Sequence, residues 1–353
     1  MKKVIDFLAK TGIYSLAILD TFIILDYFKG INFELMDTDF DYSKLMKNTS
    51  FASSDTTINQ NDDKAINNNI PIAFSNIKLD MSLNEVEELV GKADRVDVSS
   101  YGFNWHVYNR YKNTFFMIGI NNNKVVGLYS NTNNNAHLNE IKIHETDIDY
   151  IRGNFKIEEI QNNEKEYDVL KTIGHSITVY YDIHENNRVT SFEVIKNKYI
   201  NKRDYNFYSE KGLDDSRLYN EKLKKSSELQ MFDLINSTRE KFGLSKLEYD
   251  DDKAHDSSIK HALDMEENNY FAHDNLKGES PFDRMKKEGI NYSYAGENLA
   301  GGHISVIRAH EALMNSKGHR DITLTEEFEK VGIGVEFGGE RLSHYVQNYY
   351  SEK

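Results

Sequence analysis

Three short sequence strings in the last third of the chain place ionisable side chains where they could carry out chemistry. They are NYFAHD around His273, AGENLAGG around Glu297 and MNSKGHRDI around His319. Each lies beside glycine or at a helix edge, where the backbone can approach closely. Two histidines and one glutamate from separate elements could bind zinc and leave its fourth position open. The same side chains could equally form a hydrogen-bonded cluster that holds no metal.

Other catalytic motifs are missing from the sequence. His310 and Glu311 begin like the HExxH zinc motif, but the position four residues after His310 is Met314. The chain has no cysteine and no GxSxG string, so cysteine nucleophiles, disulfides and that type of serine-hydrolase elbow are excluded. We therefore expect His303, His310 and Glu311, which lie outside the three strings, to be surface residues.

Length and composition limit the class of protein. A chain of 353 residues is long for one hydrophobic core, which favours two or three domains. Hydrophobic residues make up 39% of the chain and aromatic residues 12%, so a wholly disordered protein is excluded. The formal net charge of −14 argues against nucleic-acid binding, which needs a basic surface.

Helix and strand patterns surround the three strings. Ser280, Pro281 and Asp283 predict a helix start, and Gly289 predicts its end. Apolar periodicity and turn residues predict helices over residues 229–242, 251–269 and 281–288 and from residue 305, and strands over residues 331–337 and 344–350. Helices and hairpin strands interleaved in this way predict a layered α–β–α domain of about 125 residues.

The motifs of this region also carry a resemblance. In order, they are Asn236 and Arg239, Asp264-Met265, Asn269 to His273, Gly278 to Arg284, Gly296 to Ala300, Met314 to Arg320 and Val331 to Val335. Residues 229–350 thereby resemble a bacterial member of the CAP superfamily (SCP/PR-1-like). The resemblance implies an α–β–α sandwich whose central cleft is lined by His273, Glu297 and His319. No residue matches a second cleft glutamate that many eukaryotic members carry.

Residues 71–200 read as two copies of one module. The string IKL at residue 77, followed by SLNEV, has an echo in IKI at residue 141, followed by TDIDY. Each copy predicts a short strand, a helix capped by Ser82 or Thr146, and an antiparallel hairpin with a polar turn. The duplicated module resembles the CAP-associated domain that precedes CAP domains in some Gram-positive bacterial proteins. Trp105, the single tryptophan, is expected to be a core residue.

The N-terminal segment, residues 1–30, differs from the rest of the chain. Three lysines precede a largely apolar run at residues 11–28, which predicts an uncleaved membrane anchor with the remainder exported. A soluble amphipathic helix is the alternative. Residues 31–70 are rich in Asn, Asp, Ser and Thr and predict a disordered linker, and residues 201–228 predict a solvated connector.

These patterns predict an α+β fold, with an N-terminal hydrophobic helix, the duplicated domain and a CAP domain over residues 229–353. We expect an extracytoplasmic protein, membrane-anchored or secreted, that binds a cell-envelope ligand, a lipid or a peptide through the cleft of His273, Glu297 and His319. The duplicated domain would serve as a spacer or docking surface. The alternative is a metal-dependent, peptidase-like secreted hydrolase that uses the same three residues, with zinc as the expected metal. Oligomeric state has no signal in the sequence.

Overall fold

The computed structural model describes residues 72–74, 76–109, 114–132, 136–138, 141–157, 166–200, 215–303 and 305–353. The predicted membrane anchor and the predicted linker lie outside these residues. Among the helices of the described ranges, none combines the length and apolar character needed to cross a bilayer.

The first half of the described chain is a duplicated unit of helix and antiparallel sheet. The first copy contains α3 (Leu83–Val90), β2 (Arg95–Val98), β3 (Asn104–Tyr108), β4 (Phe116–Asn121) and β5 (Lys124–Ser130). The second contains α4 (Ile148–Asn154), β7 (Tyr167–Lys171), β8 (His175–Asp182) and β9 (Arg188–Lys196), followed by α5 (Asn197–Ile200). Together they form one seven-stranded sheet in the order β2-β3-β4-β5-β9-β8-β7, beside a small pair of β1 (Ile72–Phe74) and β6 (Ala136–Leu138).

Equivalent hydrogen bonds join helix and hairpin in the two copies. The Val125 N–H donates to the Met81 carbonyl and the Val189 N–H donates to the Thr146 carbonyl, both at 2.9 Å. Both hairpins turn through two consecutive asparagines with positive φ, a conformation that asparagine tolerates. These asparagines are Asn122, Asn123, Asn186 and Asn187. The repeat read in the sequence is therefore present in the backbone.

The two helix caps differ from each other. Ser82 caps α3, as predicted, and it also forms a capping box with Glu85. The cap of α4 is Asp147 rather than Thr146, and its side chain accepts the Tyr150 N–H at 2.9 Å. Thr146 instead accepts the Lys142 N–H at 2.8 Å, which closes the turn that precedes the helix.

The second half of the chain is a sheet between helices. Its helices are α6 (Asp215–Lys241), α7 (Lys253–Asn268), α8 (Pro281–Lys287), α9 (Val306–Asn315) and α10 (Lys317–Thr323). Its strands are β10 (Glu248–Tyr249), β11 (Tyr292–Gly301), β12 (Lys330–Gly338) and β13 (Leu342–Glu352), in the order β10-β12-β13-β11. The predicted capping box of Ser280 and Asp283, with Pro281 at the first position, starts α8.

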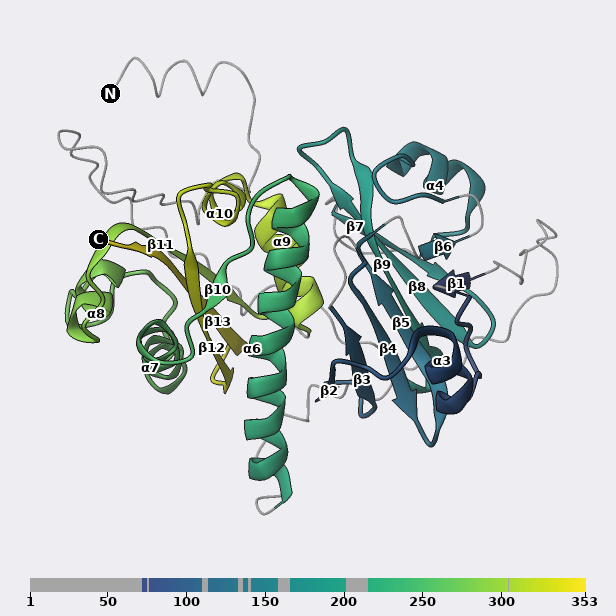
Figure 1. Ribbon diagram of the computed structural model, residues 1–353, viewed down its shortest axis with the longest axis horizontal. Helices are drawn as coiled ribbons and strands as arrows, with labels where there is room; N and C mark the ends of the chain where they lie inside the picture. Colours follow the sequence, from purple (N-terminus) through teal and green to yellow (C-terminus); the bar gives the residue numbers. More distant parts are fainter. Residues whose placement is uncertain are drawn as a thin grey trace.

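Helix α6 is longer than the sequence indicated. It begins at Asp215, so residues 215–228, predicted as a solvated connector, are its first turns. Leu223 and Glu228 in this part are only 3% exposed. Burial has a simple cause, because α6 lies between the two sheets and contacts β2 on one side and β12 on the other (Figure 1).

The opposite face of the smaller sheet accepts α7 at very short range. A Cβ atom at Gly332 would lie 2.1 Å from the Ala254 backbone, and one at Gly334 would lie 2.3 Å from the Ile259 backbone nitrogen. Only glycine fits at these positions. The string VGIGV is therefore a strand whose glycines face a helix and whose valines and isoleucine face the core with α6.

The described chain stacks in five layers (Figure 1): α7 and α8, the four-stranded sheet, the helices α6, α9 and α10, the seven-stranded sheet, and α3 and α4. One hydrophobic core runs through the middle layers. It joins Trp105 and Tyr129 of the larger sheet with Met231 of α6, Ile307 of α9 and Tyr345 of β13. Both faces of the seven-stranded sheet are thus buried, which explains nearly continuous apolar strands such as FMIGI.

Candidate functional site

The site is built around β11, the edge strand of the four-stranded sheet. Consecutive side chains of a strand point to opposite faces of the sheet. Glu297 therefore points to the face covered by α7 and α8, and Asn298 points to the face covered by α10. Each of the two side chains binds a segment that carries a histidine. Strand β11 therefore contacts the His273 segment on one face of the sheet and the His319 segment on the other face.

Glu297 is the centre of a buried charge cluster. Its Oε1 lies 2.9 Å from His273 Nδ1, and its Oε2 accepts a hydrogen bond from Arg284 Nη2 at 2.6 Å. The Glu297 side chain is 1% exposed and the Arg284 side chain 8%. Burial alone would raise the pKa of Glu297, but the Arg284 guanidinium and the hydrogen bond from His273 outweigh it, and this pKa lies below its ordinary value. Glu297 is a carboxylate at neutral pH.

Local structure places the partners of Glu297. Asn269 caps the C-terminal end of helix α7, and its left-handed backbone (φ 52°) turns the chain into the loop that carries His273. Arg284 comes from the capped helix α8, and its Nη1 donates to the His273 carbonyl at 2.6 Å. Arg284 thus binds the main chain of His273 and the carboxylate that contacts its ring, which fixes both ends of this histidine.

His319 is buried on α10, at 7% exposure. Its carbonyl accepts a hydrogen bond from Asn298 Nδ2 at 3.1 Å, and its ring Nδ1 has no hydrogen-bond partner within the described ranges. Burial, with a smaller contribution from the charge of His273, lowers the pKa of His319 to about 4. The ring is therefore neutral at pH 7 and can accept a hydrogen bond or a proton.

The carboxylate of Glu297 is already bound by two protein side chains. Both oxygens of Glu297 are engaged, one by His273 and one by Arg284. Across the residues that the structure describes, no group of three or more His, Cys, Asp or Glu is arranged to hold a metal ion. Of the three residues, His273 and Glu297 are joined by a hydrogen bond, and among the described contacts none joins the His319 ring to either of them.

Arg284 and Asn298 are functional candidates that the sequence reasoning did not single out. Both lie inside the motifs that carry the resemblance: Asn298 directly follows Glu297, and Arg284 ends the motif that begins at Gly278. A signal for Arg284 existed, because a buried glutamate needs a buried cation. Asn298 had none, since its role depends on which helix carbonyl lies across the strand.

The expectation that His310 and Glu311 are surface residues is wrong. They are 2% and 6% exposed, while His303 is half-buried. His310 Nε2 pairs with Thr238 Oγ1 of α6 at 2.9 Å, and Glu311 accepts a hydrogen bond from Ser191 Oγ of β9 at 2.5 Å. The physical reason is that α6 of the same domain covers His310 and the larger sheet covers Glu311.

A polar cavity of about 220 Å³ lies between α7 and α8. It is lined by Ser257, Lys260, His261, Asp264, Asn275, Lys277, Glu279, Arg284, Lys287 and Glu288. His261 is also a packing residue, as its Nε2 pairs with the Ala272 carbonyl at 2.9 Å and it is 1% exposed. Arg284 belongs both to this wall and to the Glu297 cluster, so the cavity and the cluster share a side chain.

Comparison with known proteins places these features. The family model for the CAP-associated N-terminal domain matches residues 79–205, and the model for the cysteine-rich secretory protein family (CAP) matches residues 232–349. The uncharacterized membrane protein YlbC of Bacillus subtilis (strain 168) is 30% identical over 283 residues, which cover 75% of this chain and 80% of that protein.

Two solved structures share both halves of the fold. An extracellular protein containing a SCP domain from Bacillus anthracis has a TM-score of 0.66 at 22% identity, covering 86% of this chain and 100% of that one. A cysteine-rich secretory protein from Staphylococcus aureus has a TM-score of 0.57 at 15% identity, covering 78% and 94%. At these identities the likeness shows the fold alone.

Proposed function

Because the chain belongs to the CAP family and carries the CAP-associated N-terminal domain, we propose that it is an extracytoplasmic protein whose CAP domain binds a polar ligand of the cell envelope. The names of its relatives, a membrane protein and an extracellular protein, support the location. Anchoring through residues 11–28 is part of the proposal. The ligand would bind beside His273, Glu297 and His319.

The observation that carries this proposal is the double role of Arg284. Its guanidinium neutralises Glu297 and its side chain lines the polar cavity. Burying an ion pair is weak evidence for stability, because desolvation offsets much of the attraction. Buried charges with shifted pKa values, next to a cavity, are the usual setting of a functional site.

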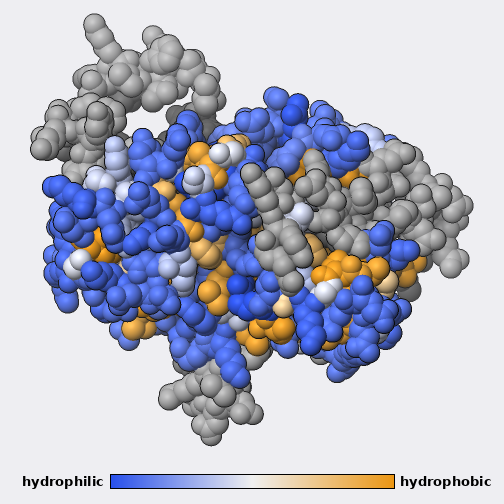
Figure 2. Space-filling model, in the orientation of Figure 1, coloured by the Kyte–Doolittle hydropathy of each residue, from blue (hydrophilic) through white to orange (hydrophobic). Residues whose placement is uncertain are grey.

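The lining of the cavity favours a peptide over a lipid. Its lysines and carboxylates largely pair with each other, as Lys260 with Glu288 at 2.7 Å and Lys287 with Glu279. Lys277 on the loop is a further cation of the lining, and we expect it to meet a ligand carboxylate. Hydrophilic residues also dominate the molecular face in Figure 2, where hydrophobic residues form small separate patches. A short envelope peptide with a free carboxylate fits this chemistry.

Binding is favoured over hydrolysis by the state of Glu297. A general acid or base must be free to exchange a proton with the substrate. Glu297 instead has a lowered pKa and gives both oxygens to fixed partners. Neutral His319 could still accept a proton, so peptide cleavage that depends on His273 and His319 remains the alternative outcome of the test.

The test is saturation-transfer NMR of the protein with short acidic peptides that end in a free carboxylate. We expect binding, weakened about tenfold by Lys277→Ala, since one charge-assisted contact contributes about 1.4 kcal/mol or more. Lys317→Ala, which removes an exposed lysine at the start of α10, should leave binding unchanged. Binding only to phosphatidylglycerol vesicles would overturn the peptide assignment, and binding to neither probe would overturn the function. Cleavage products lost in His273→Ala/His319→Ala would establish the hydrolase instead.

A further inference from the structure

The CAP-associated domain binds the part of the CAP domain that carries His319. We define this part as the α9–α10 turn, residues 315–320. Asn315 Nδ2 donates to the Tyr181 carbonyl at 2.9 Å, and the Ile183 N–H donates back to Asn315 Oδ1 at 3.1 Å. One asparagine side chain thereby pairs with the end of β8 as a neighbouring strand would.

Two further contacts join the CAP-associated domain to the α9–α10 turn. Arg320 Nη1 forms an ion pair with Asp182 Oδ2 at 2.8 Å, and His184 Nε2 donates to the Asn315 carbonyl at 2.9 Å. Asp182 is 4% exposed and Arg320 8%, so this pair is hardly screened by solvent. Four consecutive residues of the CAP-associated domain, 181–184, thus hold the turn on either side of His319.

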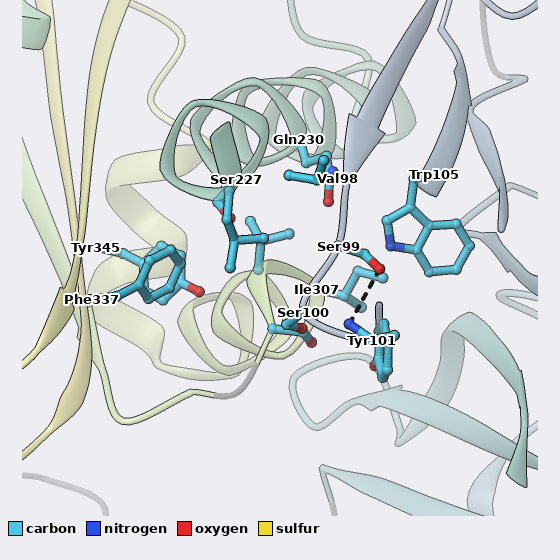
Figure 3. A pocket seen from close by; sticks show the side chains of 13 residues that line it. Val98, Ser99, Ser100, Tyr101, Trp105, Ser227, Gln230, Ile307, Phe337 and Tyr345 are labelled. Atoms are coloured by element: carbon cyan, nitrogen blue, oxygen red, sulfur yellow. Dashed lines mark hydrogen bonds between the residues drawn. The ribbon is translucent and has the colours of Figure 1, made fainter. Parts of the chain in front are cut away.

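The surrounding interface leaves the turn little freedom. Glu311, one turn of helix before Asn315, accepts hydrogen bonds from Ser191 at 2.5 Å and Thr190 at 2.9 Å of β9. Figure 3 shows the seam farther along, where Trp105 and Val98 of one domain face Ile307 and Tyr345 of the other. The cavity there measures about 20 Å³, close to the space that one water molecule needs. The seam is otherwise filled by the shared core.

We propose that the CAP-associated domain is an internal brace that positions His319, with Asp182 and Asn315 as positioning residues. The brace acts from outside the site, because neither residue touches His273, Glu297 or the polar cavity in any contact of the described residues. From the other side, Asn298 holds the His319 carbonyl. His319 is therefore set between a strand of its own domain and the hairpin of the neighbouring one. This inference does not depend on which ligand the CAP domain binds.

The test compares two ways of removing a buried aspartate from the same domain in the full chain. Asp182→Ala breaks the brace. Asp97→Ala removes an equally buried aspartate, 3% exposed, from its pair with Arg95 at 2.7 Å; Asp97 lies in β2, at the other edge of the seven-stranded sheet from β8 and β7. Both variants should lose stability. Only Asp182→Ala should speed native-state amide hydrogen exchange in residues 316–323 by at least tenfold and expose the His319 ring to carbethoxylation.

Two conservative variants separate positioning from general destabilisation. Asp182→Asn keeps an acceptor for Arg320 and should restore most of the protection of residues 316–323. Asn315→Ala removes the strand-like pair and should loosen the same residues, which also covers the case in which Asp182→Ala fails to fold. Unchanged exchange in Asp182→Ala and Asn315→Ala, or equal loosening by Asp97→Ala, would overturn the brace.

Discussion

Removal of Arg284 should be far more costly than removal of an exposed cation. Arg284→Met keeps most of the side-chain volume but leaves the Glu297 carboxylate, 1% exposed, without its cation. Breaking a buried ion pair from one side costs about 3–5 kcal/mol, which for a domain of this size lowers the melting temperature by about 6–20 °C. Lys317→Met is the control, because its pair with Asp321 is 75% and 43% exposed and should contribute under about 1 kcal/mol.

The loss should also depend on pH in a defined direction. In the wild type the pKa of Glu297 is lowered, so its stabilising contribution is present above the unfolded pKa near 4.5 and is lost as pH falls through the folded pKa. Without Arg284, burial raises the pKa of Glu297 and the carboxyl can be protonated in the folded state. The difference in unfolding free energy between wild type and Arg284→Met should therefore be greatest at pH 7 and shrink towards pH 4.5.

Chemical denaturation followed by circular dichroism and by Trp105 fluorescence measures this difference. Trp105 is the only tryptophan and is 2% exposed in the shared core, so its emission reports on the seam between the domains. The double variant Arg284→Met/Glu297→Gln removes the unpaired buried charge of Glu297. It should therefore recover part of the unfolding free energy that Arg284→Met loses at pH 7. If Arg284→Met stays within 1 kcal/mol of Lys317→Met at pH 7, Glu297 does not depend on Arg284 and the reading of the cluster is refuted.

Three further outcomes follow from the described geometry and the sequence. Calorimetric titration of the full chain with zinc should give no saturable binding near one equivalent, because Glu297 is engaged; such binding, lost in His273→Ala/His319→Ala, would establish the zinc site instead. Gly332→Ala should lower the unfolding free energy by about 3 kcal/mol or prevent folding, as its Cβ would overlap the α7 backbone; denaturation near wild-type values would contradict that packing. Deletion of residues 1–30 should move the protein from the membrane fraction to the soluble fraction on cell fractionation, and retention at the membrane would count against the anchor.

Features fixed by neighbouring residues could be predicted from the sequence. The capping box of Ser280 and Asp283, the end of α6 before Gly243 and the asparagine turns each depend on hydrogen bonds within a few residues. The hydrogen bond between His273 and Glu297 was also within reach, but through family motifs that bring distant strings together rather than through local propensity.

Strand β11 shows where local patterns fail. The string AGENLAGG holds glycines and polar residues, which are depleted in strands, yet it is the strand that organises the site. Its glycines leave room for side chains that are distant in sequence. A Cβ atom at Gly296 would lie 3.1 Å from the Phe328 ring, and one at Gly301 would lie 2.9 Å from the Phe271 ring. The composition of this string could not reveal a strand, because the residue types at these positions are set by contacts with distant parts of the chain.

Helix α9 shows the same limit between domains, with a consequence for function. Glu311 looks solvent-facing when the CAP domain is considered alone, because ionisable side chains are seldom buried unless paired. Glu311 is paired by Thr190 and Ser191, which lie more than a hundred residues earlier in a different domain. The polar side of α9 is thus complementary to the polar face of a sheet rather than to water. Because α9 and the start of α10 bind the neighbouring domain through Glu311 and Arg320, the site at His319 should be studied with both domains present.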